Sequence, residues 1–112
     1  MKLNDENLRQ GDVNLVRVNK LPPNMDDVTP KTGRVVLMHG EATGHAHAFY
    51  DGGVSVYRSP KSKSDRPDYL RVVETAYLKH EEHTEAKVPP GLYRITTQVE
   101  HTDDDEPIVV AD

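Results

Sequence analysis

The stretch HAHAFYDGGVSVYR, residues 45–58, decides the fold class that we expect for this chain. On either side of residues 51–53, apolar or aromatic residues recur at every second position, a period typical of a β-strand with one buried face. Asp51-Gly52-Gly53 supplies glycines that tolerate the positive φ angles of a tight turn. The stretch therefore predicts two strands, 45–50 and 54–58, joined as a hairpin.

Short segments with the same alternation recur along the chain between glycine and proline turn signals, and no long segment shows a clear helical period. They predict further strands at 12–19, 34–39, 69–73, 75–80, 92–101 and 108–110, where 69–73 and 75–80 are two short strands or one bent strand. A helical alternative also stays open, because 72–83 could instead form an amphipathic helix. Its β-branched and aromatic residues favour a strand.

The regions between the predicted strands indicate how the domain is organised. Long loops are expected near 20–33 and 59–68, and the first of them holds a Pro-rich segment, 21–30, that is not expected to pair in a sheet. An acidic tail occupies 102–112. The sequence thus predicts a single all-β domain over 1–112, a small barrel or sandwich of about seven short strands.

The composition limits both the compartment and the kind of chemistry. Of the 112 residues, 35% are hydrophobic and 29% are charged, the formal net charge is −5, and there is no cysteine. A disulfide framework, a thiolate zinc site and a cysteine nucleophile are therefore excluded. The sequence shows neither a secretory leader nor an apolar run of about 18 residues, so we expect a cytoplasmic protein, or one of the host cytoplasm if the source is a virus.

Charge and core size also bear on the partners. The acidic balance argues against nucleic acid, because non-specific binding depends on Lys and Arg neutralising phosphates. The basic stretch 58–66 is a local exception and is interpreted as a solvated loop. A core built from so few apolar residues is thin, and we therefore expect a homo-oligomer that buries additional surface. A small molecule or a host protein are the other partners that remain open.

Two histidines lie on one face of the strand predicted at 45–50. Side chains two residues apart in a strand point the same way, with Cα atoms roughly 6.5–7 Å apart, so His45 and His47 share a face with Phe49. Phe49 marks that face as the interior. Two imidazoles that converge from an inner β face can both reach one metal ion at about 2.0–2.2 Å.

Other histidines extend apolar faces downstream. His80 follows Ala76 and Leu78 on one face of the strand predicted at 75–80. His83 lies three residues further on and would point the opposite way in a straight strand, so it joins His80 only if the chain bends at Glu81-Glu82. Two more histidines stand at the ends of apolar faces, His39 and His101.

The segment GEATGHAH, residues 40–47, followed by Asp51, resembles the first metal-binding motif of the cupins. The resemblance implies a small β-barrel whose metal is held by two or three histidines and a glutamate. The second cupin motif carries Pro-x-Gly with a histidine three residues later. This chain has Pro-Pro-Gly at 89–91, but Arg94 stands where that histidine would be. The resemblance therefore covers the first motif and only the turn of the second.

A second resemblance covers most of the chain. The pattern GExTGHxH (40–47), HxxH (80–83) and PPGxY (89–93), with RQGDV at 9–13, is similar to small uncharacterised proteins of bacteria and their phages. This resemblance implies a shared fold and site and carries no function with it.

The leading hypothesis is a small β-barrel that binds a divalent metal, Zn, Fe, Mn or Ni. The expected ligands are four histidines: His45, His47, His80 and His83. Four nearby carboxylates could complete the set: Glu41, Asp51, Glu81 and Glu82. Three histidines with an open position would suit a hydrolytic or lyase site, whereas two histidines and a carboxylate would suit iron and oxygen chemistry.

Two other functional hypotheses remain open. The chain could be a non-enzymatic accessory or structural module that oligomerises or binds a partner, with its histidines packed in the core. It could also use a histidine pair for metal-free acid–base catalysis on a phosphoester, with Arg94 or Arg71 stabilising the phosphate. Glu41 is a candidate general base, although a role as a turn residue is the preferred interpretation.

Overall fold

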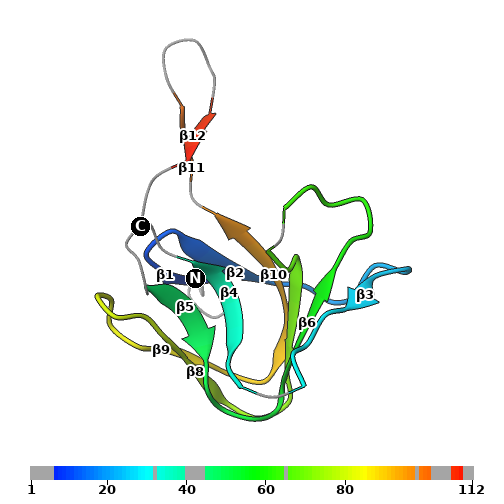
Figure 1. Ribbon diagram of the computed structural model, residues 1–112, viewed down its shortest axis with the longest axis horizontal. Helices are drawn as coiled ribbons and strands as arrows, with labels where there is room; N and C mark the ends of the chain where they lie inside the picture. Colours follow the sequence, from blue (N-terminus) through cyan, green and yellow to red (C-terminus); the bar gives the residue numbers. More distant parts are fainter. Residues whose placement is uncertain are drawn as a thin grey trace.

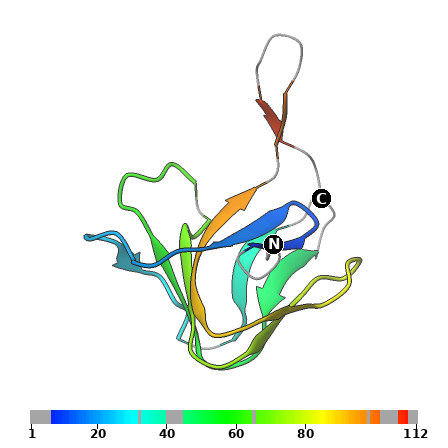
Figure 2. The same ribbon diagram turned by 180° about the vertical axis from the view of Figure 1, so that it is seen from behind.

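Two antiparallel sheets face each other in the body of the protein (Figures 1 and 2). The computed structural model describes residues 7–31, 33–39, 45–64, 66–97, 99–101 and 107–109. The six-stranded sheet contains, in spatial order, β1 (Asn7–Gln10), β2 (Val13–Arg17), β10 (Gly91–Thr97), β7 (Tyr69–Val72), β6 (Val54–Arg58) and β3 (Asp26–Asp27). The four-stranded sheet contains β4 (Val35–His39), β5 (Ala46–Phe49), β8 (Ala76–Lys79) and β9 (Ala86–Val88).

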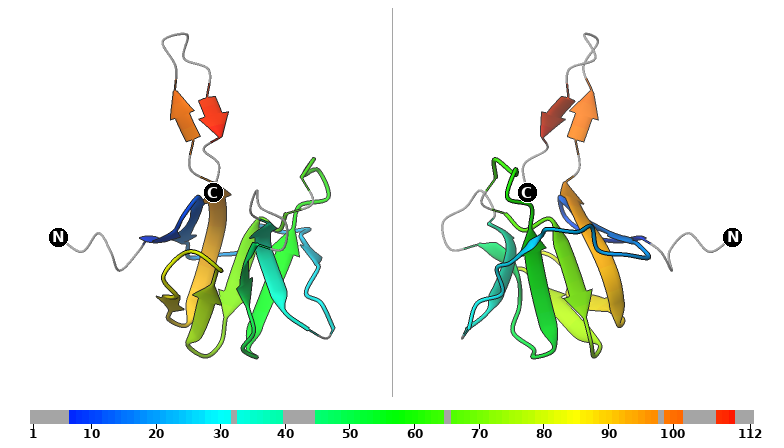
Figure 3. Two further views of the ribbon diagram at one scale, coloured as in Figure 1. Left: turned by 60° about the vertical axis from the view of Figure 1, so that its left-hand side comes forward. Right: turned by 90° about the vertical axis from the view of Figure 1, so that its right-hand side faces the viewer.

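A separate two-stranded ribbon extends away from these sheets. It consists of β11 (Val99–His101) and β12 (Pro107–Val109), which pair only with each other among the described strands. Figure 3 shows it projecting from the end of β10. The strand expected at 92–101 is therefore divided between β10 in the body and β11 in the ribbon.

The all-β fold class is confirmed. The described residues form twelve strands and no helix, so none of them provides a helix that could cross a membrane. The helical alternative for 72–83 is wrong, because β7 ends at Val72 and β8 spans Ala76–Lys79. The larger strand number arises mainly from three short edge elements that were not predicted, namely β1, β3 and β9.

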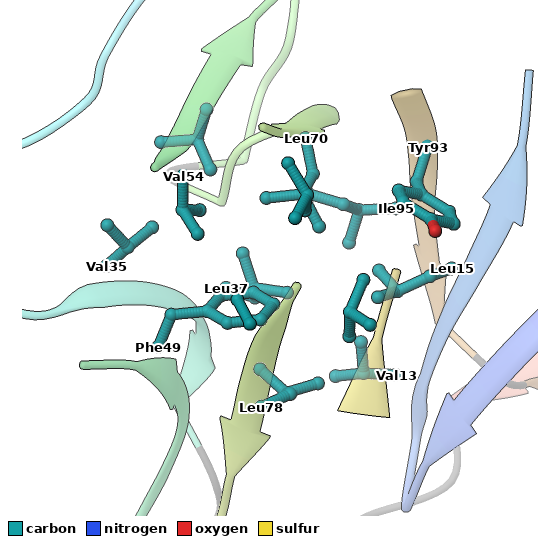
Figure 4. Close-up of a cluster of buried hydrophobic side chains, with 14 residues drawn as sticks. Val13, Leu15, Val35, Leu37, Phe49, Val54, Leu70, Leu78, Tyr93 and Ile95 are labelled. Atoms are coloured by element: carbon teal, nitrogen blue, oxygen red, sulfur yellow. The ribbon is translucent and has the colours of Figure 1, made fainter. Parts of the chain in front are cut away.

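The hydrophobic core lies between the two sheets, as Figure 4 shows for side chains that point toward one another. The six-stranded sheet contributes Leu15, Leu70 and Tyr93, and the four-stranded sheet contributes Phe49 and Leu78. All five are at most 1% exposed. Full burial of a side chain as large as Phe49 contributes about 1.5–3 kcal/mol, and Phe49 is only two residues from His47 along β5. The core therefore anchors the strand that carries the histidine pair.

The predicted hairpin between 45–50 and 54–58 is wrong. β5 pairs with β4 and β8, whereas β6 pairs with β3 and β7 in the other sheet. The Asp51–Gly53 segment therefore carries the chain from one sheet to the other, and Gly53 has the positive φ (77°) expected of a turn glycine. The alternation predicted strands correctly but did not specify their partners, because a strand with one buried face can pair on either edge.

Two connections cross between the sheets at this same corner, β5 to β6 and β7 to β8. The backbone N–H of Val73 donates to the carbonyl oxygen of Gly53 at 2.8 Å. The N–H of Tyr77 donates to Oδ2 of Asp51 at 2.8 Å. These bonds tie the two crossings together and orient β8 against β5.

Two smaller expectations also need correction. Asp26 and Asp27, within the Pro-rich segment, do pair with β6, because the prolines flank them and leave their N–H groups in place. His39 does not continue a buried face: β4 has an irregular register between Val36 and Met38, and His39 ends exposed. A β-bulge re-aims the side chains that follow it, which explains this outcome.

Candidate metal centre

The pairing of β5 with β8 sets the histidines against each other. Phe49 of β5 lies opposite Leu78 of β8 in an antiparallel register. Continued two residues back from Phe49 and two residues on from Leu78, this register places His47 opposite His80. Directly opposed residues have Cβ atoms about 4.5–5.5 Å apart, close enough for their rings to touch. The strand register therefore builds the cluster from residues 33 positions apart.

The rings of all four histidines named from the sequence lie together. The ring centroid of His80 is 4.3 Å from that of His47 and 4.6 Å from that of His83. The His45 centroid lies 5.5 Å from that of His80, and the His83 centroid 5.8 Å from that of His47. His83 reaches the cluster because the chain bends at 81–83, as its spacing from His80 required.

Three residues form a group that could hold a metal ion: His45, His80 and Glu81. One nitrogen of each imidazole and one carboxylate oxygen all lie within 4.8 Å of one another, and no other group in the described ranges meets this condition. An ion bound at about 2.0–2.2 Å from each ligand would bring the ligand atoms to about 3.0–3.6 Å from one another. The group is thus assembled, and its ligand atoms would need to move together by at most about 1–2 Å around an ion.

Glu81 enters the group because β5 holds its carboxylate. The backbone N–H of Ala46 donates to Oε1 of Glu81 at 2.9 Å. This hydrogen bond, with one from the backbone N–H of Glu81 itself, holds the pKa of the carboxyl below its ordinary value, and the imidazoles of His45 and His80 act in the same direction. Glu81 is therefore a carboxylate at neutral pH, the form in which it would coordinate a metal.

The next carboxylate, Glu82, contacts two members of the cluster. Its Oε2 lies 3.7 Å from Nδ1 of His45. Its backbone N–H donates to Nδ1 of His80 at 3.0 Å. Glu82 is exposed, whereas His45 and His80 are half-buried. The cluster thus lies at the protein surface, with an acidic residue on its outer side.

His47 and Gln10 form the buried part of the site. The His47 side chain is fully buried, and its Nδ1 lies 2.8 Å from Oε1 of Gln10. Gln10 ends β1, an edge strand of the other sheet that lies against β9. Sequence reasoning missed Gln10 because the first strand was expected to begin at Asp12, and a single glutamine beside a turn has no distinctive pattern.

A small pocket of about 210 Å³ opens beside the metal-ligating group. It is lined by Ala46, Tyr50, Lys79, His80 and Glu81. Two members of the group therefore face a space that solvent or a small ligand can reach.

The remaining residues named from the sequence lie elsewhere or outside the described residues. Asp51 braces β8 through Tyr77 and does not join the group. Arg94 is exposed on β10 and lines a different pocket, of about 490 Å³, together with Lys61. Arg71 is exposed on β7. Glu41 is among the residues that the structure does not describe.

The comparison with protein families gives one match. The profile of a family described as Domain of unknown function (DUF8820) matches residues 9–98, well over half of the chain. The chain belongs to the DUF8820 family. The matched range of this DUF8820 chain includes Gln10 and all four clustered histidines. No curated protein and no solved structure shows a significant match to it.

Proposed function

We propose that this protein binds one divalent metal ion through His45, His80 and Glu81, at the open end of the β5–β8 pair. The observation that carries the proposal is the convergence of two imidazole nitrogens and one carboxylate oxygen within 4.8 Å. Glu81 supports it further, because its lowered pKa keeps it ionised and its bond to Ala46 holds it in place.

The donor set favours one kind of chemistry over the others. Two imidazoles and one carboxylate leave coordination positions open, and this combination is characteristic of non-haem Fe(II) sites. Zn, Mn and Ni also accept nitrogen and oxygen donors, so they belong in the same test. The pocket beside His80 and Glu81 provides room for a small ligand at the open positions.

The hypothesis of metal-free acid–base catalysis on a phosphoester receives less support from the geometry. It needs a cation beside the histidine pair to stabilise the phosphate. Arg94 lines a pocket that includes none of the clustered histidines, and Arg71 is exposed on β7 of the other sheet. The metal-binding hypothesis needs no residue beyond His45, His80 and Glu81, which already converge.

Metal stoichiometry tests the proposal. The protein is purified without a histidine tag, stripped with a chelator, and challenged separately with Zn²⁺, Fe²⁺ under anaerobic conditions, Mn²⁺ and Ni²⁺. After desalting, elemental analysis is expected to find about one ion per chain for at least one metal. His80→Ala and Glu81→Ala should lose it, because each removes one of the three donors.

A matched control uses a histidine outside the cluster. His101 belongs to the β11–β12 ribbon, which pairs with neither sheet. His101→Ala should therefore retain the ion. Sub-stoichiometric binding of all four metals by the wild type would refute the proposal and leave the histidines a packing role. Equal loss in His80→Ala and His101→Ala would show binding that does not depend on the site.

A further inference from the structure

A pocket of about 530 Å³ lies away from the histidine cluster, against β4 and the loop that follows β6. Its volume falls in the range of pockets that take small ligands. The strand β4 contributes residues 36–39, and the loop contributes Ser64, Arg66 and Pro67. None of the four clustered histidines lines it. A ligand bound here would therefore be distinct from the metal ion.

Arg66 brings a charged donor to the wall of this pocket. It is half-buried, and its Nη1 is shielded from solvent and has no hydrogen-bond partner. A guanidinium nitrogen can only donate, and a charged donor that is removed from water without an acceptor costs free energy. A ligand that supplies the acceptor is one explanation for such a group.

The loop holds Arg66 in this position through Ser64. The backbone N–H of Arg66 donates to Oγ of Ser64 at 3.0 Å. The carbonyl oxygen of Ser64 in turn accepts from Nη1 of Arg58 at 2.8 Å, which ties the loop to the end of β6. The donor without a partner therefore lies on a braced segment.

An adjoining pocket of about 360 Å³ adds two more arginines. It shares Val36 and Pro67 with the first pocket and is also lined by Arg34 and Arg58. Nη1 of Arg34 donates to the hydroxyl of Tyr50 at 3.1 Å, a neutral partner like the carbonyl oxygen that Arg58 contacts. Three arginines thus border two pockets that meet at the same pair of apolar residues.

The charge of this region is opposite to that of the chain as a whole. The formal net charge of the protein is −5, yet no aspartate or glutamate in the described part of the chain lines either pocket. Within the described residues, Arg34, Arg58 and Arg66 form no ion pair with a carboxylate. A concave surface lined by one sign of charge concentrates ligands of the other sign.

We propose that these two adjoining pockets bind a small organic anion. Its carboxylate or phosphate group is held by Arg66, and its apolar body lies against Val36 and Met38, which are half-buried. The planar fork of an arginine matches the oxygens of either group. These oxygens supply the acceptor that Nη1 of Arg66 lacks. The site uses none of the metal-ligating residues, so it stands or falls independently of the metal centre.

Binding is tested with three probes: naphthoate, naphthyl phosphate and the neutral analogue naphthol. Metal-free protein is titrated in buffer without phosphate or carboxylates, and the chain has no tryptophan whose emission would overlap that of the naphthyl group. At least one of the anions should bind at one site per chain, about 10-fold or more tightly than naphthol. The preferred anion distinguishes a carboxylate site from a phosphate site. Equal affinity for naphthol, or no binding of either anion, would overturn the proposal.

Two variants that each remove one positive charge from the loop locate the site. Arg66→Met should lower the affinity for the anion by about 10-fold and leave that for naphthol unchanged, because it removes only the charged donor. Lys63→Gln is the matched control, since Lys63 is exposed and lines neither pocket, and it should bind as the wild type does. An equal loss in both variants would show attraction by the net charge alone and would overturn the proposal.

A measurement on the wild type keeps the test valid if Arg66→Met fails to fold, which circular dichroism detects. In ¹⁵N-labelled protein, the anion should shift the backbone amide signals of Val36, Met38 and Arg66 most strongly. Shifts that centre on β5 and β8 instead would place the anion at the histidine cluster and overturn the proposal.

Discussion

A Gly91→Ala substitution should destabilise the protein through the side chain of Arg17. Gly91 begins β10 with φ of +155°, a conformation that residues with a side chain rarely adopt. A Cβ at this position would overlap Nη1 of Arg17 and stand 3.1 Å from its Cζ. Because the guanidinium is the end of a flexible side chain, it is the group that moves.

The cost follows from what Arg17 loses when it moves. Its Nη1 donates to the carbonyl oxygen of Pro90 at 3.2 Å, and its Nη2 donates to the Tyr93 hydroxyl at 3.0 Å. Its Cζ also lies 4.9 Å from the centroid of the Tyr93 ring. Each hydrogen bond is worth about 0.5–1.5 kcal/mol, the cation–π contact about 0.5–1 kcal/mol and the backbone strain about 1–3 kcal/mol. Because the guanidinium is partly exposed, the lower values apply and the total is about 2–4 kcal/mol.

Thermal and urea unfolding, followed by circular dichroism, measure this loss. For a domain of this size, about 1 kcal/mol lowers Tm by about 4 °C, so a fall of about 8–16 °C is expected. Gly52→Ala is the matched control, because a Cβ there meets nothing within 4 Å. It should change the free energy of unfolding by no more than about 0.5 kcal/mol.

A double-mutant cycle identifies the cause. In an Arg17→Ala background, Gly91→Ala should cost only the backbone strain, since the contacts of the guanidinium are already gone. If the full cost persists in that background, the overlap with Arg17 is not its source. A wild-type Tm in Gly91→Ala would refute the reasoning as a whole.

Three further outcomes are expected. Tyr93→Phe removes the hydroxyl that donates to Pro89 at 2.7 Å and should cost about 1–2 kcal/mol. Burial raises the pKa of the Tyr93 hydroxyl. Its contribution to stability is therefore complete below about pH 10 and is lost as the pH rises through the raised pKa. A profile of Tm against pH should show this fall in the wild type and not in Tyr93→Phe. The pKa of Glu81 is lowered chiefly by the N–H of Ala46, so the contribution of Glu81 to stability is complete above the ordinary carboxyl pKa and is lost as the pH falls through the lowered value. Glu81→Gln should flatten the fall of Tm at acid pH and still weaken metal binding. An unchanged fall of Tm at acid pH would contradict the assignment. Asp51→Ala removes the acceptor for β8 and should cost about 0.5–1 kcal/mol by urea unfolding, with Asp51→Asn close to wild type.

The period-two pattern was sufficient to predict strands but insufficient to pair them. Val54 and Val56 alternate with half-buried residues, and the segment is a strand as predicted. Its neighbour in the sequence, β5, lies in the other sheet, because alternation records which face is buried and not which edge is paired. The edge strands β3 and β9 have only two and three residues, too few to show a period at all.

The histidines illustrate the same division between sequence and tertiary structure. The local sequence was enough to predict that His45 and His47 follow one strand face, that His80 ends another, and that His83 needs a bend to join them, because these are consequences of strand geometry over a few residues. The tertiary structure then established that β5 and β8 pair in the register that brings His47 to His80. It also decided that Gln10 reaches His47 from the opposite sheet, 37 residues away. Contacts of this kind depend on how separate strands pack around a common core, and a local pattern carries no information about that packing.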